Sequence, residues 1–267
     1  MITSTSNDRV RRVVSFVEKS KARREEKVFV IEGMKMLREA PVLQVREVYV
    51  TEKFLDKASE EDKEILWRYG AEPVSEEVMK KMAATQTPQG VLAVVSQYHY
   101  TMEEVIEGHN QEAEGAAPLI LVLENIQDPG NLGTMLRSGE GAGVTGVMLS
   151  KGSADIYNPK VIRSTMGSIF RMPFIYVEDL PKELKKLKDN GIHTYAAHLK
   201  GQKNYDEFDY TKPTAFLIGN EGNGLTKETA DAADTYILIP MKGEVESMNA
   251  ATSSAILTFE ASRQRRS

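Results

Sequence analysis

The second half of the chain alternates short apolar runs with helical patterns, and no other feature limits its possible folds as strongly. Helical or loop patterns separate each apolar run from the next. Six runs have the length and composition of buried strands: Leu119–Leu123, Gly146–Leu149, Phe174–Val177, His193–Ala197, Ala215–Ile218 and Tyr236–Ile239. Strands that alternate with helices form a mostly parallel sheet covered on both faces. The sequence therefore predicts an α/β domain that ends in a helix over roughly residues 247–264.

A smaller α/β pattern precedes this domain. Strands are expected at Val28–Ile31, Val45–Val50 and Gly90–Val95. Helices are expected at Asn7–Lys19, from Gly33 onward, at Glu60–Tyr69 and at Ser75–Met82. Residues 109–117 lack apolar periodicity and are rich in small and polar side chains, which is typical of a linker. Because 267 residues suit two domains, we expect domains at 1–108 and 118–267, joined by the linker 109–117.

The composition excludes several kinds of chemistry. The chain has no cysteine, so it has neither disulfides nor thiolate ligands and nucleophiles, which suits a reducing cytoplasm. The longest apolar run, Leu119–Leu123, is too short to cross a bilayer, and residues 1–8 are polar. The four histidines lack the spacing of zinc ligands. We therefore expect a cytoplasmic protein that binds no membrane and no metal.

Positive charge is concentrated at the amino terminus. The net charge of −5 argues against a phosphate binder, yet residues 1–40 hold ten Lys and Arg against six Asp and Glu. Basic side chains neutralise nucleic-acid phosphates, and such binding weakens as salt is added. Seven side chains are candidates for this contact: Arg9, Arg11, Arg12, Lys19, Lys21, Arg23 and Arg24. A solvated basic helix would give the same pattern without a ligand.

Three polar turns follow predicted strands, at the sheet edge where open α/β sheets bind ligands. The first turn, NLGTMLR, runs from Asn131 to Arg137. Arg137 lies nearly two helical turns beyond Asn131 and is expected to face a similar direction. Its guanidinium could then meet a phosphate or ribose near the loop. An Asn helix cap together with an Arg in an ordinary ion pair would explain the same residues.

The second turn, GNEGNGL, runs from Gly219 to Leu225. Three glycines in six residues allow the backbone to approach a ligand closely. The glycine spacing differs from that of a dinucleotide-binding loop, and no acidic ribose partner follows the next strand. This absence argues against the alternative of a nucleotide-dependent oxidoreductase. A tight turn with a solvated Glu221 is the simpler interpretation.

The third turn, IPMKGEVESMNAA, runs from Ile239 to Ala251. A strand ends at Pro240, and we expect the next helix to begin with Ser247 as its N-cap. The free N–H groups beside such a cap can bind a ligand. The small side chains of Ala250 and Ala251 allow close packing of that helix. Capping and packing alone would also account for the pattern.

Together and in this order, the three turns resemble the SpoU, or TrmH-type, branch of the SPOUT superfamily of RNA 2′-O-methyltransferases. The resemblance covers most of residues 118–264 and rests on the signatures N-x-G-x-x-x-R, G-x-E-G-x-G-L and I-P-M-x-G-x-x-x-S-x-N. Residues 1–95 resemble, more loosely, the substrate-binding domain often fused to such enzymes. The motifs of this second resemblance are Ser6-Asn7, Glu32-Gly33 and Gln86-Thr87-Pro88-Gln89-Gly90.

The resemblance implies a smaller N-terminal RNA-binding domain and a C-terminal SPOUT domain whose chain, from Ala215 onward, threads a trefoil knot. It also implies a homodimer formed through the C-terminal domain, with S-adenosylmethionine as cofactor. The cofactor-binding positions it indicates are Gly219, Gly222, Gly224, Ile239, Met241, Gly243 and Met248. Met248 stands where the family often has leucine, a change that keeps volume and apolar character. Asn220 stands where a small residue is frequent.

The implied reaction is methyl transfer to a ribose 2′-hydroxyl of a structured RNA, with ribosomal RNA favoured over transfer RNA. Because the sulfonium is already activated, positioning carries most of the catalysis. The catalytic positions that the resemblance indicates are Arg137, Asn131, Glu221, Ser247 and Asn249. We expect Arg137 to stay protonated and to stabilise charge rather than act as a base. The alternative is a non-catalytic RNA-binding protein that keeps this fold.

Overall fold

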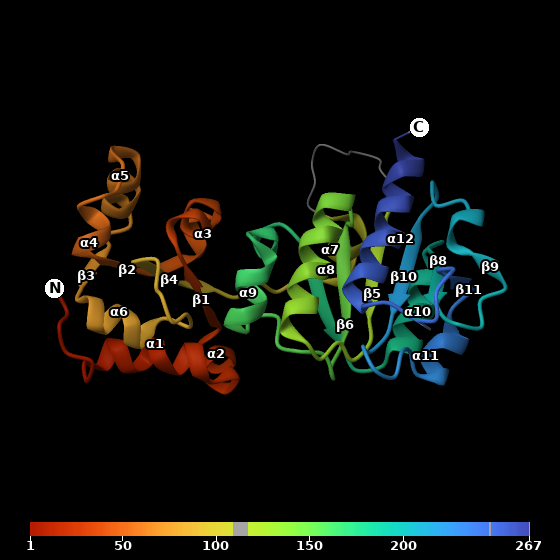
Figure 1. The fold of residues 1–267 in the computed structure, drawn as a ribbon, viewed down its shortest axis with the longest axis horizontal. Coiled ribbons are helices and arrows are strands. Elements are labelled where there is room, and N and C mark those ends of the chain that lie inside the picture. The colour runs from red at the N-terminus through yellow and green to blue at the C-terminus, as the bar shows by residue number, and fades with distance from the viewer. Residues whose placement is uncertain (109–116, 246, 267) are drawn as a thin grey trace. The chain divides into compact units, whose positions relative to one another are not determined.

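The computed structural model describes residues 1–108, 117–245 and 247–266 (Figure 1). The chain forms two compact units. Unit 1 comprises Met1–Tyr98 together with Asp155–Phe170, and unit 2 comprises residues 99–154 and 171–267. Most of the predicted linker, residues 109–116, lies outside the described residues.

Unit 1 contains a four-stranded sheet in the order β1-β4-β2-β3. Strand β4 is antiparallel to β1 and β2, whereas β2 and β3 are parallel. The strands are β1 (Val28–Glu32), β2 (Val45–Thr51), β3 (Glu72–Val74) and β4 (Val91–Ser96). The helices are α1 (Asp8–Glu18), α2 (Ser20–Glu26), α3 (Met34–Glu39), α4 (Glu52–Leu55), α5 (Glu60–Arg68), α6 (Glu76–Met82) and α9 (Pro159–Thr165), with 3-10 turns at Val42–Gln44 and Ser168–Phe170.

Helix α1 shows how the sequence builds this unit. The Asn7 side chain accepts a hydrogen bond from the Arg9 N–H at 2.9 Å and so caps the helix. Val10, Val13 and Phe16 recur at three-residue intervals, lie on one face and are buried against α6 and the sheet. The arginines of the helix lie on the other face and are exposed.

Unit 2 contains a seven-stranded sheet in the order β7-β6-β5-β10-β8-β11-β9, and all of its strand pairs are parallel. The prediction of an α/β domain with a parallel sheet is confirmed. The strands are β5 (Leu119–Leu123), β6 (Gly146–Ser150), β7 (Phe174–Val177), β8 (His193–Ala197), β9 (Lys203–Asn204), β10 (Thr214–Ile218) and β11 (Thr235–Leu238). The helices are α7 (Met102–Glu107), α8 (Pro129–Ala142), α10 (Leu180–Asp189), α11 (Lys227–Ala232) and α12 (Ala250–Arg265), with a 3-10 turn at Tyr205–Glu207.

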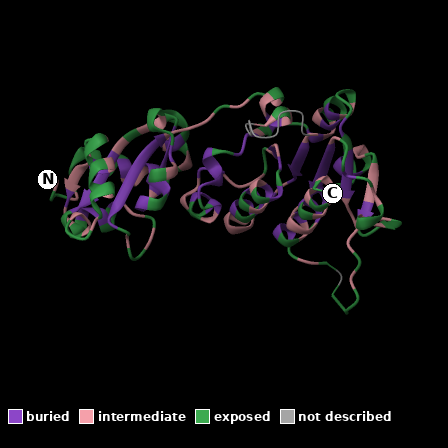
Figure 2. Ribbon diagram, turned by 90° about the horizontal axis from the view of Figure 1, so that it is seen from above, coloured by how far each residue is buried: buried purple, intermediate pink, exposed green. Residues whose placement is uncertain are grey.

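Helices cover both faces of this sheet, and its central strands are buried (Figure 2). Alternate residues of β5, Ile120 and Val122, pack in one core with α7, α10 and α11. The intervening Leu121 faces Gly139 of α8, which itself packs against α12. Burial on both faces explains why β5 and β10 are apolar throughout. The trefoil knot stays a prediction from the resemblance.

None of the helices in the described part of the chain is both long enough and apolar enough to span a membrane.

Candidate active site

The carboxylate of Glu221 joins two of the three turns. Its Oε1 accepts hydrogen bonds from the Asp128 N–H at 3.1 Å and from Asn131 Nδ2 at 3.0 Å, and its Oε2 accepts one from the Gln127 N–H at 3.1 Å. Strands β5 and β10 are parallel neighbours, with Ile218 paired to Leu123. Their following loops therefore leave the same edge of the sheet, which brings together residues about ninety positions apart in sequence.

Asn249 brings in the third turn. Its Nδ2 donates to Asn131 Oδ1 at 3.0 Å, while its Oδ1 accepts from the Ala251 N–H at 2.9 Å and the Thr252 N–H at 3.2 Å. The expectation that Ser247 caps this helix is wrong, because α12 begins at Ala250 and Asn249 is its N-cap. The hydrogen bonds from Asn249 to Asn131 and from Asn131 to Glu221 thus link all three turns.

Asn131 is free to form this chain because another residue caps its own helix. Asp128 is the N-cap of α8 and accepts from the Asn131 N–H at 2.8 Å. The interpretation of Asn131 as a helix cap is therefore wrong. Its carboxamide instead donates to Glu221 and accepts from Asn249.

Glu221 is held in its ionised form. Partial burial by itself would raise the pKa of this carboxyl group, but the hydrogen bonds from Asn131 and from the Gln127 and Asp128 N–H groups outweigh it. The net effect lowers the pKa below its ordinary value of 4.5. Both carboxylate oxygens already accept hydrogen bonds, so Glu221 is suited to position the turns.

The glycine turn depends on one close backbone approach. A Cβ at Gly219 would lie 2.1 Å from the carbonyl carbon of Gly224 and from the backbone nitrogen of Leu225, a distance no side chain tolerates. Asn220 and Gly224 exchange two backbone hydrogen bonds across the loop. Gly224 adopts a positive φ of 68°, where glycine is favoured.

Asn220 fixes the shape of this turn with its side chain. Its Oδ1 accepts from the Gly222 and Asn223 N–H groups, each at 3.0 Å, and its Nδ2 donates to the Asn125 carbonyl at 2.8 Å. The position that departs from the family pattern therefore has a clear structural role. It ties the glycine turn to the loop after β5.

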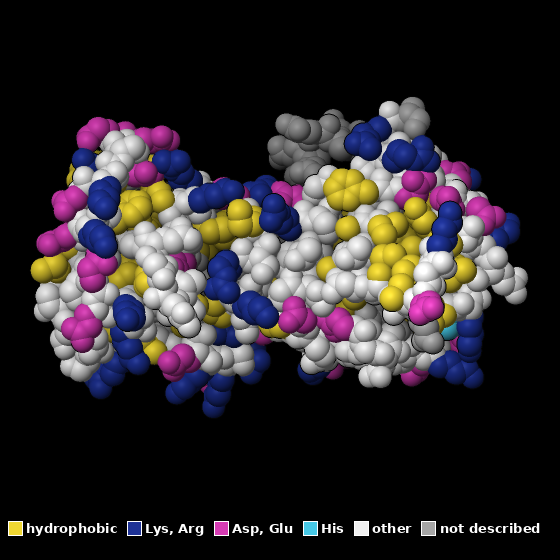
Figure 3. All heavy atoms as spheres, in the orientation of Figure 1, with side chains coloured by type: hydrophobic (Ala, Val, Ile, Leu, Met, Phe, Trp, Pro, Cys, Tyr) yellow, Lys and Arg dark blue, Asp and Glu magenta, His cyan; other side chains and the backbone are white. Residues whose placement is uncertain are grey.

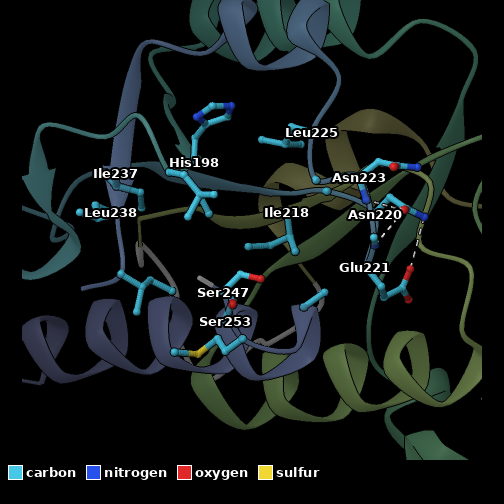
Figure 4. Close-up of a pocket in the computed structure, with 18 of the residues that line it drawn as sticks. His198, Ile218, Asn220, Glu221, Asn223, Leu225, Ile237, Leu238, Ser247 and Ser253 are labelled. Atoms are coloured by element: carbon cyan, nitrogen blue, oxygen red, sulfur yellow. Dashed lines mark hydrogen bonds between the residues drawn. The ribbon is translucent and has the colours of Figure 1, made fainter. Parts of the chain in front are cut away.

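A cavity of about 320 Å³ lies beside the glycine turn (Figure 4). Ile237 and Leu238 lie on one side of it, and Asn220 and Glu221 on the opposite side. Predicted cofactor residues that line the cavity are Gly219, Gly222, Gly224, Ile239, Met241 and Met248. Gly243 does not line it, whereas the predicted catalytic residues Glu221 and Ser247 do. The volume falls at the small end of the range for ligand pockets.

Sequence reasoning missed one wall of this cavity. Ala197, His198 and Leu199 line it from the carboxyl end of β8. The His198 ring stacks on Tyr236 at a centroid distance of 4.9 Å, and its Nδ1 accepts from the Lys200 N–H at 3.0 Å. The signal available in the sequence was that His198 and Leu199 directly follow a predicted strand, and the carboxyl ends of parallel strands meet at one edge of the sheet.

The residues present suit a nucleoside-like cofactor. Apolar side chains such as Ile218 and Leu238 can pack against a flat base, and the glycine turn offers backbone N–H and C=O groups to polar atoms. Among the residues that the structure describes, no group of three or more His, Cys, Asp or Glu side chains could hold a metal ion.

Arg137 stands apart from the linked turns. The expectation that it faces the same way as Asn131 is wrong, because α8 is a continuous helix and six residues rotate the side chain by about 240°. Arg137 is exposed and forms no hydrogen bond or ion pair with any described residue. The ordinary ion pair considered for it is therefore not present either. Its guanidinium is available to a ligand or to another chain.

Comparison with known proteins decides the family. The profile of the SpoU rRNA Methylase family matches residues 118–259, and that of the MRM3-like substrate binding domain matches residues 7–93. The chain belongs to the SpoU rRNA methylase family. A Bacillus subtilis (strain 168) protein, 23S rRNA (guanosine(2553)-2′-O)-methyltransferase RlmP, is 33% identical over 186 residues, which cover 70% of this chain and 70% of that protein.

Two crystal structures of similar proteins contain AdoMet. The SpoU methyltransferase AviRb from Streptomyces viridochromogenes is 25% identical, with a TM-score of 0.84 over 98% of this chain and 99% of that one. An rRNA methyltransferase from Sinorhizobium meliloti is 27% identical, with a TM-score of 0.82 over 98% of this chain and 97% of that one. The similarity to these two proteins extends over both units.

The seven predicted RNA-binding residues of this SpoU methylase all belong to unit 1, and they divide into two groups. Six are exposed, as a phosphate contact requires: Arg9, Arg11, Arg12, Lys19, Lys21 and Arg24. The expectation that Arg23 contacts RNA is wrong, because its side chain is only 4% exposed. Its Nη2 donates to Asp155 Oδ2 at 2.6 Å and its Nη1 to the Phe16 carbonyl at 2.7 Å. Arg23 therefore serves the fold of unit 1.

Proposed function

We propose that this chain transfers a methyl group from S-adenosylmethionine to the 2′-hydroxyl of a ribose in a structured RNA, with ribosomal RNA favoured over transfer RNA. The observation that carries the proposal is the linkage of Glu221, Asn131 and Asn249 beside a cavity lined by the glycine turn. RlmP is named as a methyltransferase that acts on 23S rRNA, and the AviRb neighbour binds AdoMet. Because the substrate is RNA, we place the activity in the cytoplasm.

Positioning is the main task of the protein in this reaction. S-adenosylmethionine supplies a methyl group that its sulfonium centre already activates. The residues proposed to hold it are Gly219, Gly222, Gly224, Ile239, Met241, Gly243 and Met248. The chain from Glu221 through Asn131 to Asn249 fixes the three turns against one another. Ser247, on the cavity wall, completes the set of polar groups around the target ribose. A fixed geometry lowers the barrier because the reacting atoms are already aligned.

Arg137 acts on the target nucleotide. A guanidinium remains protonated near neutral pH, so it donates hydrogen bonds and does not remove the ribose proton. We assign it to stabilising the developing negative charge on the ribose oxygen, or to anchoring the adjacent phosphate. The lack of any protein partner for Arg137 among the described residues supports this role, since no ion pair has to be broken before RNA binds.

The active form is a homodimer joined through unit 2. Phe259 of α12 is 45% exposed and lies against Gly141 of α8, and hydrophobic side chains gather over α12 on the face shown in Figure 3. Exposed apolar patches of this kind are typical of protein interfaces. A second chain placed there would bring its own residues near the exposed surface of α8. Sedimentation equilibrium that returned the mass of one chain would contradict the dimer.

The methyl-transfer proposal is tested with tritiated S-adenosylmethionine and ribosomal RNA from cells that lack this protein. Wild-type protein should label the RNA at a position that then resists alkaline cleavage. Arg137→Ala should reduce labelling by about 100-fold or more, the effect of removing one charge-stabilising donor, while cofactor affinity stays within about twofold. Lys185→Ala, an exposed charge on α10, is the matched control.

Three results would count against the proposal. Unchanged turnover of Arg137→Ala would overturn the role of that residue. A protein that binds RNA but retains no S-adenosylmethionine would be the non-catalytic RNA binder. Affinity for a nicotinamide cofactor in place of S-adenosylmethionine would favour the oxidoreductase.

A further inference from the structure

Unit 1 contains a second cavity, of about 140 Å³, that the proposed methyl transfer does not use. It lies among β1, α3, α9 and the loop before β4. Its walls are mainly apolar and include Val30, Met36, Leu92 and Ile162. An apolar cavity of roughly 150 Å³ accommodates one benzene molecule, so this one suits a flat aromatic group.

Two motifs that the sequence analysis left without a role form one wall of this cavity. Glu32 Oε1 accepts from Thr85 Oγ1 at 2.6 Å and from the Gln89 N–H at 3.2 Å. Gly33 adopts a φ of +92°, and a Cβ there would also lie 2.2 Å from Gln89 Oε1. The Glu32-Gly33 and Gln86–Gly90 motifs therefore meet because each shapes the same wall.

The cavity offers one acceptor and two cations. Glu32 lines it, and its second oxygen, Oε2, has no hydrogen-bond partner among the residues that the structure describes. Lys35 and Arg163 also line the cavity and are exposed, and neither forms an ion pair with a described residue. Figure 3 shows Lys and Arg side chains gathered around a hydrophobic area between α3 and α9. The site therefore combines an apolar slot, an anionic acceptor and a basic rim.

We propose that this cavity receives one unstacked RNA base that carries an exocyclic amino group, with Lys35 and Arg163 on its flanking phosphates. Proteins that read single-stranded RNA place splayed bases in such slots and bind their Watson–Crick edges. A carboxylate can only accept hydrogen bonds. It therefore favours the amino groups of adenine and cytosine over uracil, which places carbonyl oxygens on both sides of its single N–H. This inference rests on the proposed function, since it names where the RNA is read.

The test measures binding of the full-length chain, without cofactor and at low salt, to fluorescein-labelled pentamers of A, C and U. Oligo(A) and oligo(C) should bind about tenfold more tightly than oligo(U), the discrimination expected from one good base contact. Glu32→Gln keeps an oxygen for Thr85 and Gln89 but replaces the free acceptor with a donor, so the preference should fall to within about twofold. Glu77→Gln, an exposed change on α6, should leave the preference intact.

A second variant keeps the test valid if Glu32→Gln disturbs the fold. Ala84 is exposed and lines the cavity, so Ala84→Ile fills the slot at a position that tolerates larger side chains. This variant should lower the affinity for oligo(A) and oligo(C) to that for oligo(U). Lys35→Ala should weaken all three pentamers alike, because it acts on phosphate.

The proposal is overturned if wild-type protein binds the three pentamers equally, or if Ala84→Ile and Glu32→Gln both keep the preference. Equal binding would mean that Lys35 and Arg163 hold only the RNA backbone. Neither result affects the methyltransferase assignment, which fails separately if the wild-type chain binds no S-adenosylmethionine.

Discussion

Several side chains at the active site have a structural role in addition to any role in the reaction. Asn249 caps α12 through its oxygen and holds Asn131 through its nitrogen. Glu221 accepts hydrogen bonds from two backbone groups and from Asn131. Substituting either residue would therefore disturb the turns and the chemistry together. Arg137 has no such structural role, so its substitution is the clean test of the reaction.

The stability contributed by Glu221 should depend on pH in a defined direction. Its pKa is lowered in the folded chain, so the ionised form stabilises the fold. That contribution is fully present above the ordinary pKa of 4.5 and is lost as the pH falls through the folded pKa. The difference in Tm between wild type and Glu221→Gln should therefore be constant down to about pH 4.5 and shrink below it. Thermal melts across this pH range measure the difference in Tm, with Glu228→Gln of α11 as the control. A difference in Tm that widens in acid would contradict the prediction.

Helices α8 and α12 begin beside the site, and one buried carboxylate, that of Glu124, joins the loop after β5 to the start of α11. Glu124 follows β5 and is 6% exposed. It accepts from the Thr226 N–H at 2.7 Å, from Thr226 Oγ1 at 2.8 Å and from Thr229 Oγ1. These bonds fix the start of α11 and the end of the glycine turn. The turn is thus held at one end by Asn220 and at the other by Glu124.

Removing this carboxylate should therefore affect both stability and cofactor affinity. Glu124→Ala removes the acceptor of three donors, of which Thr229 Oγ1 is buried, and this costs about 2 to 4 kcal/mol of unfolding free energy. Cofactor affinity should fall as well, because Leu225 at the end of the turn lines the cavity. Glu124→Gln keeps one acceptor oxygen and should recover part of both losses. Urea unfolding and calorimetric titration measure the two effects; unchanged cofactor affinity in Glu124→Ala would separate Glu124 from the site.

At the level of elements, the sequence predicted six of the seven strands of the parallel sheet, most clearly β5 and β10, whose burial on both faces leaves continuous apolar runs. It did not predict α7, α9 or β9, which are short and carry weak periodicity. It placed the cap of α12 two residues early, because Ser247 and Asn249 are both good N-cap types. The three turns could be predicted to converge, but the hydrogen bonds that join them could not, since they depend on side-chain geometry.

For the molecule as a whole, compact units and sequence segments do not coincide. Residues 155–170 lie within the stretch matched by the SpoU profile, yet they pack in unit 1. Arg23 and Asp155, which are 132 residues apart, form an ion pair inside that unit. A buried arginine has the same sequence appearance as an exposed one. This is why the basic amino-terminal segment predicted seven RNA contacts, whereas the fold leaves six of these side chains exposed.

The neighbouring residues Arg23 and Arg24 allow two roles of positive charge to be tested separately: stabilising the fold of unit 1 and contacting RNA phosphate. Arg23→Ala removes a nearly buried cation and leaves Asp155 without its partner. The free energy of unfolding should therefore fall by about 3 kcal/mol. Arg24→Ala changes an exposed side chain and should alter stability by no more than about 0.5 kcal/mol.

RNA binding should respond in the opposite way. Arg24→Ala should lower affinity for ribosomal RNA and reduce the slope of log affinity against log salt by about 0.7 to 0.9, the loss of one phosphate contact. Arg23→Ala should leave that slope unchanged under conditions where the variant is folded. Denaturant unfolding and salt titrations of both variants make the comparison. A salt slope that changes with Arg23 and not with Arg24 would show that unit 1 opens at α2 when it binds RNA, because only then could Arg23 reach a phosphate.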